Sequence, residues 1–439
     1  MTNHKRITTN KKRKTITVIL LILSLSFSIQ AFSQVNDLEN ITNLHYYFDD
    51  NKMETGATFN TFASSNSINN KFVSALYGKK YIDNELKNSN KLKPINYLGN
   101  QDNINAYFCH KPDTFLGTNN TGYRIGLVYH NHRDMKFTDD LFNLMFFGNK
   151  RFAGDTADIS NLRLNLITYQ ELQFGIFQKT MVDENPFTYY IGLSFIKGQE
   201  FHALKVNEAT IFTAETGEYI DLDINMTHQC IDTVKSELLD INGIGGALNM
   251  ACIYEDVKHK IVYNLSISNI GFIRWKSSAI TIPVDTTHRF EGLEIENLLD
   301  MSQTGFTDYN ADTIITDFFS HTDTSEYYKV LPERIHFSAT KTLQNNKLWL
   351  TAGFGYYYNS NARMPLFYAS TLYRINNYIK ASVFTGYGGY GSYKLGLGVK
   401  LNMFDNKASL NINSNNLLGV IIPQHSFSQS LYVSLAYRF

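Results

Sequence analysis

Polar side chains occupy alternate positions in the stretch between Leu164 and Phe177. In a strand, apolar residues at the even positions of this stretch share one face. The other face then carries the polar residues Asn165, Tyr169, Glu171 and Gln173. A carboxylate among amides and a phenol can form ion pairs, transfer protons or bind a polar ligand. Basic residues on other stretches can join them: Arg124, Lys380, Lys394, Lys400 and Arg438. We therefore predict a shared polar interior, with Glu171 as the first residue to mutate.

This interior has two interpretations. It can be a polar passage or ligand site, or it can be a network of ion pairs and hydrogen bonds that fills the inside of a barrel. The filling network is the favoured interpretation, because interior side chains of barrels commonly pack in this way.

One stretch has the residue spacing of a calcium loop. Asp308, Asn310 and Asp312 alternate, so that their oxygens can converge on one ion. An EF-type loop also needs glycine at its sixth position and an acid at its twelfth, where this sequence has Thr313 and Phe319. A solvated polar loop is therefore favoured.

Two further motifs are incomplete as chemical sites. His130 and His132 have the spacing of metal ligands but no third ligand nearby, so we predict solvated histidines at a strand end and assign no metal. Glycines alternate with tyrosines from Gly386 to Tyr393, but no helix follows, which favours an outer hairpin with tyrosines at a membrane interface. No serine, histidine and carboxylate are linked by a motif. We expect neither enzyme activity nor a cofactor.

The elements that would hold these residues are long strands. From Tyr393 to Met403 the odd positions are apolar, whereas lysine, glycine and asparagine fill the even ones. The same alternation recurs at 261–267 and 189–195. Such strands run for about 9 to 12 residues, the length a tilted strand needs to cross a bilayer, and longer than the average strand of a soluble sheet.

Composition excludes several classes of protein. Lys+Arg and Asp+Glu both number 40 among 439 residues, so bulk attraction to nucleic acid is not expected. A mean hydropathy of −0.24 is too polar for a bundle of membrane helices. Cys109, Cys230 and Cys252 are too few for a disulfide framework.

The N-terminus has the features of an export signal. Basic residues precede one apolar run, Ile16 to Ile29, which is shorter than the roughly 20 residues of a spanning helix. Ala31 and Ser33 fit the small-residue rule of signal peptidase. We predict a signal peptide over 1–33 and a periplasmic segment over 34–54, with an N-terminal membrane anchor as the alternative.

Short turns and long loops alternate along the rest of the chain. Gln344 to Asn346 is a tight polar turn, whereas Asn415 to Gln429 is long. Outer-membrane barrels have this asymmetry. We predict an all-β transmembrane antiparallel barrel over 55–439, with about 14 strands, in the range of roughly 12 to 16. The expected strands are 55–63, 103–109, 122–130, 163–178, 187–197, 244–254, 260–269, 335–343, 347–358, 365–374, 378–386, 393–404, 406–414 and 430–439.

Four connections are long enough to cap or plug the lumen from the outer side: 64–102, 131–162, 198–243 and 271–334. Within the second, the spacing of Leu141, Phe142, Leu144 and Met145 favours a short helix. If that stretch were a strand, the first strand of the barrel would move.

The last strand ends the chain on an aromatic residue. Apolar residues line one of its faces at Leu431, Val433, Leu435, Tyr437 and Phe439. An amphipathic strand closing on a terminal phenylalanine resembles the recognition signal of barrels inserted by the outer-membrane assembly machinery. We expect that machinery and periplasmic chaperones as partners during biogenesis, with outer-membrane lipid around the folded barrel.

Several stretches together resemble a known family. They are Leu141 to Asn149, Tyr169 to Glu171, Gly243 to Tyr254 and Ser268 to Lys276, of which Gly-Phe-Ile-Arg-Trp-Lys is the most distinctive part. This is an uncharacterised outer-membrane barrel family of the Bacteroidota. Its architecture is similar to that of the long-chain fatty-acid transporter barrels, which implies fourteen strands and a route for a hydrophobic ligand. No ligand residues of those transporters match positions in this sequence.

The resulting hypothesis is an outer-membrane barrel that serves as a passage or carrier for a small or hydrophobic solute. The alternative is a structural or docking barrel for a secretion or surface-motility assembly, with a protein partner at the outer loops. A barrel enzyme acting on lipids is a third hypothesis.

Overall fold

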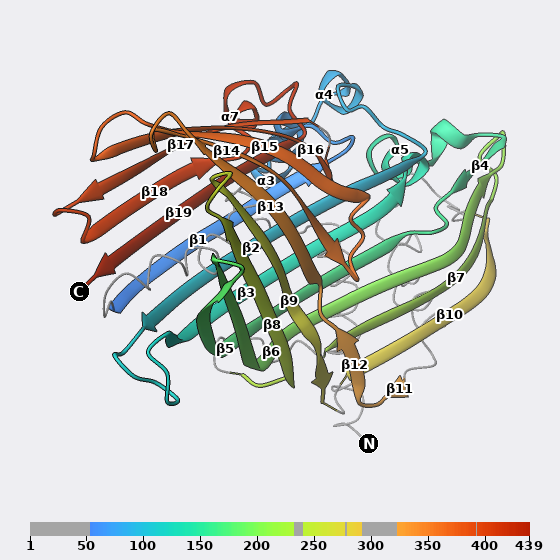
Figure 1. Cartoon of the computed structure of the whole chain (residues 1–439). Coiled ribbons are helices and arrows are strands. Elements are labelled where there is room, and N and C mark those ends of the chain that lie inside the picture. The colour runs from blue at the N-terminus through green and yellow to red at the C-terminus, as the bar shows by residue number, and fades with distance from the viewer. Residues whose placement is uncertain (1–52, 232–239, 277–278, 292–322, 392) are drawn as a thin grey trace.

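Fourteen antiparallel strands close into a barrel within the part of the chain that the structure describes (Figure 1). This computed structural model describes residues 53–231, 240–276, 279–291, 323–391 and 393–439. Each barrel strand pairs with the next, and the first and last strands close the ring, with Thr55 opposite Tyr437 and Ser64 opposite Ser428. The predicted fold class is confirmed. The predicted signal peptide and the Asp308 motif lie outside the described residues.

The barrel strands correspond to the fourteen that the sequence predicts. They are β1 (Met53–Ser65), β2 (Ile95–His110), β3 (Thr121–Thr138), β5 (Arg163–Val182), β6 (Asn185–Thr213), β8 (Gly243–Asp256), β9 (Ile261–Trp275), β13 (Glu333–Leu343), β14 (Leu348–Tyr358), β15 (Met364–Arg374), β16 (Ile379–Gly389), β17 (Tyr393–Met403), β18 (Ala408–Ser414) and β19 (Ser428–Arg438).

Alternation of side chains separates an apolar outside from a polar inside. Leu127, Leu193 and Phe195 point outward and are 62%, 67% and 58% exposed. Their neighbours Val128 and Ser194 point inward and are buried. Side chains that are apolar and exposed around a closed sheet form the surface that a barrel presents to lipid.

The two ends of the barrel differ, and we call them the turn end and the loop end. At the turn end, short connections join β5 to β6, β8 to β9, β13 to β14, β15 to β16 and β17 to β18. In one of them Gln344, Asn345 and Asn346 all have positive φ, a conformation that asparagine tolerates better than most residues. Such turns reverse the chain in very few residues.

The loop end carries the helices of the described chain. The connection from β1 to β2 holds α3 (Asn70–Tyr77) and α4 (Asn84–Asn88), and the one from β3 to β5 holds α5 (Asp139–Phe147), η3 (Asn149–Phe152) and β4 (Asp155–Asp158). The helix predicted around Leu141 is thus α5, and the hydroxyl of Thr138 accepts a hydrogen bond from the Leu141 amide at its N-terminus. The short helix α7 (Leu418–Ile421) precedes β19. None of the described helices has the length and apolar character needed to cross a membrane.

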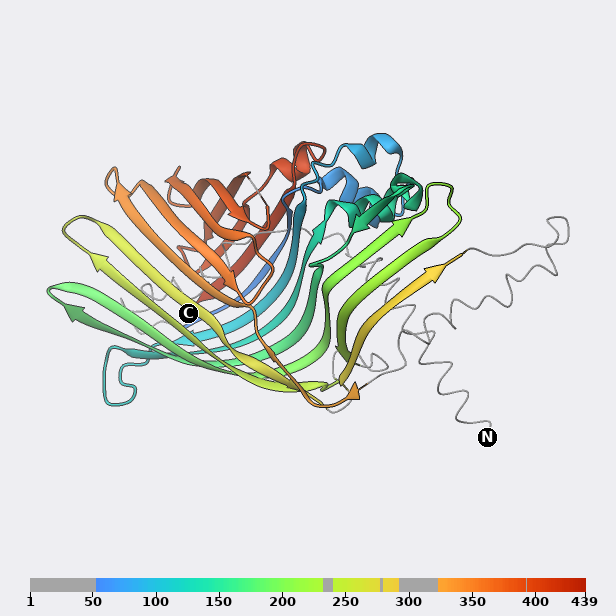
Figure 2. The same cartoon turned by 90° about the vertical axis from the view of Figure 1, so that its right-hand side faces the viewer.

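Strand β6 continues beyond the barrel wall into an outer extension. Its first half pairs with β8, whereas from His202 onward it pairs with β7 (Ile220–Ile231), which in turn pairs with β10 (Ala279–Phe290). Figure 2 shows this green-to-yellow layer bending away from the rest of the barrel. The predicted connection 198–243 therefore contains extended sheet. We call the upper half of β6, with β7 and β10, the outer extension.

Two short strands follow the outer extension in sequence. They are β11 (Asp323–Thr324), which pairs with β10, and β12 (Tyr327–Val330), which pairs with β9. Both fall in the predicted connection 271–334, of which 292–322 lies outside the described residues.

Candidate functional site in the barrel lumen

A buried polar network centres on Glu171 in the middle of the lumen. Strands β3 and β5 pair so that His130 faces Tyr169 across the sheet, two positions from Glu171 on the same inner face. Nε2 of His130 lies 2.8 Å from Oε2 of Glu171, and Nδ1 of the same ring lies 2.9 Å from Oδ1 of Asn103. Nδ2 of Asn249 donates to the other carboxylate oxygen at 3.3 Å. The carboxylate is 1% exposed.

The other predicted lumen residues of this wall join the same network. Arg124 donates to the side-chain oxygen of Gln173 at 3.1 Å, and its guanidinium lies over the ring of Tyr107. Tyr169 stacks on His130 with ring centroids 4.6 Å apart, and Nδ2 of Asn269 donates to the Tyr169 hydroxyl. The structure thus brings Arg124, Tyr169, Glu171 and Gln173 together.

A second network, centred on Asp134, joins the loop end to the lumen wall. Its carboxylate accepts hydrogen bonds from the Tyr390 hydroxyl at 3.1 Å and from the amide and side chain of Asn361 at 2.8 and 2.7 Å. Asn165 donates to it at 2.9 Å, and Lys329 donates to the oxygen of Asn165. We call the contacts of Asp134 with Tyr390 and Asn361 the latch, because they tie two loop-end connections to β3.

The latch depends on a glycine. Gly99 lies opposite Asp134 in the pairing of β2 with β3, and the ring of Tyr390 lies directly on it. A Cβ at position 99 would come within 2.2 Å of that ring. Any side chain there would therefore push Tyr390 away from the Asp134 carboxylate.

The structure corrects two sequence predictions in this region. His130 and His132 are buried at 8% and 3% exposure with carboxylate partners, so the prediction of solvated histidines at a strand end is wrong. The reason is that β3 continues to Thr138 and places both rings inside the barrel. Tyr390 was expected at a membrane interface and is instead fully buried in the latch, while Tyr387 and Tyr393 are exposed on the outside.

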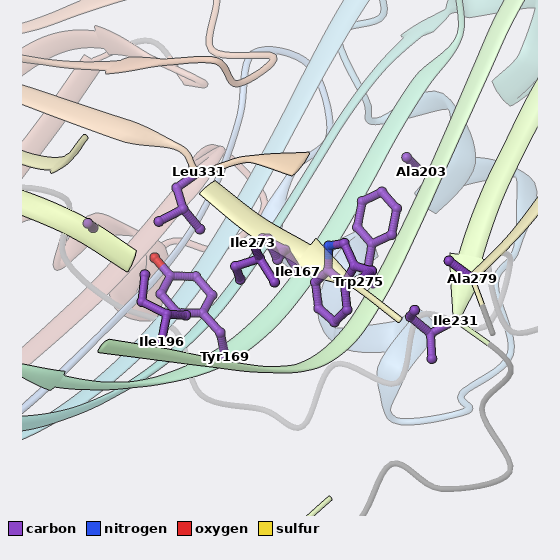
Figure 3. Close-up of a cluster of buried hydrophobic side chains, with 11 residues drawn as sticks. Ile167, Tyr169, Ile196, Ala203, Ile231, Ile273, Trp275, Ala279 and Leu331 are labelled. Carbon is purple, nitrogen blue, oxygen red and sulfur yellow. The ribbon is translucent and has the colours of Figure 1, made fainter. Parts of the chain in front are cut away.

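Apolar side chains obstruct the lumen on both sides of the polar network. Towards the loop end, Trp275 stacks on Phe201 at 5.4 Å, and Phe201 stacks on Tyr327. Leu331, which follows β12, packs into the same cluster above Tyr169 (Figure 3). Towards the turn end, a second cluster comprises Tyr107, Cys109, Phe177, Tyr190, Ala251 and Ile253.

The space between the clusters is small. The cavity lined by Arg124, His130, Tyr169 and Arg334 has a volume of about 70 Å³. One water needs about 10–15 Å³ by this measure, so the cavity has room for roughly five waters or one small polar molecule. The cavity that the described residues leave at this place is too small for larger solutes.

A basic vestibule opens at the turn end. Arg374, Lys380 and Lys400 lie directly opposite one another on the neighbouring strands β15, β16 and β17. They line a cavity of about 390 Å³ with Arg438 and Asp405. Two of the predicted lumen lysines are therefore in the vestibule, away from Glu171. Nε of Arg438 donates to Glu54 at 2.7 Å.

The remaining predicted residues lie elsewhere. Lys394 is buried near the loop end, in a small cavity with Phe62, Asn415 and Ser430. The apolar residues of the terminal strand face outward, with Leu435 and Phe439 54% and 64% exposed.

Sequence reasoning missed Asp134, Arg374 and Asn249 as members of these networks. A signal existed for Arg374, since the positions of β15 alternate in the same manner as those of β16. None existed for Asp134, because its partner Tyr390 is 256 residues away. Chemically, the lumen can hold polar groups and small ions.

Comparisons with known proteins identify the family. Residues 49–405 match the model described as "Family of unknown function (DUF5723)". No curated protein matches this sequence.

The solved structures that are similar to this chain include the following three. The toluene transporter TodX of P. putida is 9% identical, with a TM-score of 0.42, covering 90% of this chain and 91% of that one. A FadL homologue of Pseudomonas aeruginosa is 7% identical, with a TM-score of 0.42 and coverage of 89% and 90%. The translocator domain of the autotransporter NalP from Neisseria meningitidis is 7% identical, with a TM-score of 0.35 and coverage of 91% and 94%.

Proposed function

We propose that the chain, which belongs to the family of unknown function (DUF5723), is an outer-membrane passage for a small anionic solute. In the proposed orientation, the turn end of the barrel faces the periplasm and the loop end faces the outside of the cell, as in barrels with short periplasmic turns. The outward apolar surface supports the membrane location. We also propose that the chain comes from the Bacteroidota. The stretches from Leu141 to Asn149 and from Ser268 to Lys276 support this, because they resemble a barrel family of that phylum.

The row of basic residues in the vestibule carries the proposal. Like charges directly opposite one another destabilise a sheet, yet Arg374, Lys380 and Lys400 occupy three consecutive strands in register. Lys380 and Arg374 both lie over the ring of Trp349, which holds them in place. Four basic side chains and one acidic one line this cavity, so it attracts anions.

The lining of the lumen favours a small polar solute over a hydrophobic one. Asn103, His130, Asn249 and Arg334 present hydrogen-bonding groups around the central cavity. The apolar clusters towards the two ends leave little free volume, so passage requires side chains of both clusters to move together with the loop-end connections. The latch at Asp134 is the contact that would open, because it holds Tyr390 and Asn361 inside the barrel.

Single-channel recording in planar bilayers tests the proposal. We expect channels that prefer anions, and more frequent openings for Asp134→Asn, which weakens the latch. Two unit charges about 8 Å from an ion in water stabilise it by roughly 1 kcal/mol. Replacing Lys380 and Lys400 together by glutamine removes this attraction for an anion and an equal repulsion of a cation, so it should lower the anion-to-cation permeability ratio about thirtyfold.

Lys341→Gln is the matched control. This lysine is at the same end of the barrel but is exposed on the outer face, so its loss should leave selectivity unchanged. Absence of conductance in both the full chain and Asp134→Asn, or equal selectivity in all variants, would count against an anion passage.

A docking barrel is the second candidate, and the outer extension favours it. Strand β6 has 29 residues, about three times the length needed to cross a bilayer. Its upper half, β7 and β10 present a sheet beyond the barrel wall to a secretion or surface-motility partner. A photo-crosslinker at the exposed Asp223 should capture such a partner in cells. Recovery of only assembly factors or periplasmic chaperones, which we propose act during biogenesis, would count against docking.

A further inference from the structure

Three side chains of metal-binding type meet in the outer extension. They are His202 on β6 and His228 and Cys230 on β7. Their ligand atoms all lie within 4.8 Å of one another. All three residues are buried, at 7%, 4% and 8% exposure.

Backbone pairing places these residues without help from any loop. His202 is directly opposite Cys230 in the pairing of β6 with β7. His228 lies two positions before Cys230 and therefore on the same face of the strand. The rings of His202 and His228 stack at an interplanar angle of 12°, with centroids 6.2 Å apart. Two adjacent strands thus present both imidazoles and the thiol to one point.

The two imidazoles each have a ring nitrogen without a hydrogen-bond partner among the described residues. These atoms are Nδ1 of His202 and Nε2 of His228. A buried polar atom left in this way destabilises the fold unless a ligand satisfies it. A neutral imidazole has the lone pair that a metal ion needs.

We propose that His202, His228 and Cys230 form a binding site for a borderline-soft transition-metal ion such as Zn²⁺. Two imidazole nitrogens and one thiolate are ligands that zinc accepts, with bonds of about 2.0 and 2.3 Å. In a tetrahedral site such ligand atoms lie roughly 3.5 Å apart. Binding draws the three atoms together by about 1 Å, which side-chain rotation can supply, and leaves a fourth position for another ligand.

Glu200 is a positioning residue for this site. Its Oε1 lies 3.6 Å from Nε2 of His202, the nitrogen opposite to the unpartnered one. A carboxylate behind a ligating histidine orients the ring and raises its basicity. The metal joins β6 to β7 where β6 leaves the barrel wall, so it stiffens the outer extension. This role does not depend on the proposed passage.

Cobalt binding to the purified full chain in detergent tests the proposal. Co²⁺ replaces Zn²⁺ in such sites and reports a bound thiolate by a charge-transfer absorption band. After treatment with a chelator, we expect one equivalent of Co²⁺ to produce this band and Zn²⁺ to remove it. A chain that binds no stoichiometric Co²⁺ or Zn²⁺ would overturn the proposal.

Variants assign the ligands. Cys230→Ser should abolish the band, and His228→Gln should weaken binding at least about a hundredfold. Glu200→Gln should weaken it about tenfold to a hundredfold. Cys252→Ser is the matched control, because this cysteine is on β8, outside the site, and should bind as the unmodified chain does.

Folding of each variant is checked by the mobility shift that barrels show on unheated gels. If Cys230→Ser does not fold, His228→Gln and the spectrum of the unmodified chain still decide the question. Equal binding by folded Cys230→Ser, His228→Gln and Cys252→Ser would show that the metal binds elsewhere and would overturn the proposal.

Discussion

Replacing Glu171 tests the lumen network most directly. The carboxylate accepts hydrogen bonds from His130 at 2.8 Å and Asn249 at 3.3 Å while it is 1% exposed. Glu171→Gln preserves the shape of the side chain but removes its charge and turns one acceptor into a donor. A hydrogen bond to a charged group contributes about 1.5–3 kcal/mol, and a donor left facing another donor costs about 1–3 kcal/mol. We expect the free energy of unfolding to fall by about 2.5–6 kcal/mol.

Urea unfolding of the barrel in lipid vesicles measures this loss. Tryptophan fluorescence and gel mobility report the folded fraction. Glu255→Gln is the control: Oε1 of this residue lies 3.8 Å from Nζ of Lys179 at the turn end, with both side chains about a quarter exposed. A pair of this kind contributes about 0–1 kcal/mol. Equal losses for the two variants would refute the buried network.

A double-mutant cycle isolates the contact itself. His130→Gln alone and together with Glu171→Gln should show a coupling energy of about 0.5–3 kcal/mol. Additive losses would mean that the two residues do not act as a pair, despite the 2.8 Å separation of their atoms. Conductance of the same variants in bilayers shows whether the network has a further role. If the network only fills the barrel, the conductance of the variants should equal that of the unmodified chain.

Three further outcomes follow from the structure. Trp275→Ala, which removes the fully buried ring stacked on Phe201, should lower the free energy of unfolding by about 3–5 kcal/mol in the same urea assay. Phe439→Ala should reduce the folded fraction on unheated gels of cell membranes while leaving the unfolding midpoint of the barrel that does fold unchanged, because this ring is 64% exposed. The hydrogen bond from Arg289 lowers the pKa of Asp221 in the folded protein. The pair therefore stabilises the fold at pH values above the unfolded pKa of about 3.9, and this stabilisation is lost as the pH falls through the folded pKa. The protection of β7 amides against exchange, relative to the intrinsic rate at each pH, should therefore fall at low pH, and Asp221→Asn should remove this fall in protection.

The arrangement of the strands could be predicted closely. The stretch predicted at 393–404 is β17 (Tyr393–Met403), and the stretch at 163–178 lies within β5 (Arg163–Val182). Alternation is a local property, since a strand with one apolar and one polar face shows it in its own residues. The inward positions of Glu171 and Lys400 follow from the same local property.

Sequence reasoning failed where both faces of a strand are polar. Strand β3 was expected to end near His130, because the four residues from Asn131 to Asp134 are polar at odd and even positions alike. It continues to Thr138, because its pairing with β2 extends to that residue and Met135 and Phe137 pack in an apolar cluster near the loop end. The continuation of β6 into the outer extension was also missed.

The sequence by itself determined where the fourteen barrel strands lie, which of their faces is apolar and that the chain closes as a barrel. Only the tertiary structure decided which inward residues meet: Glu171 with His130, Tyr390 with Asp134, and the lysines of the vestibule apart from both. The same holds for His202 and His228, which the register of β6 and β7 brings together. The physical reason is that alternation reports the side on which a residue lies but not its height or its neighbour across the lumen, which depend on strand register and on how the loops fold inward.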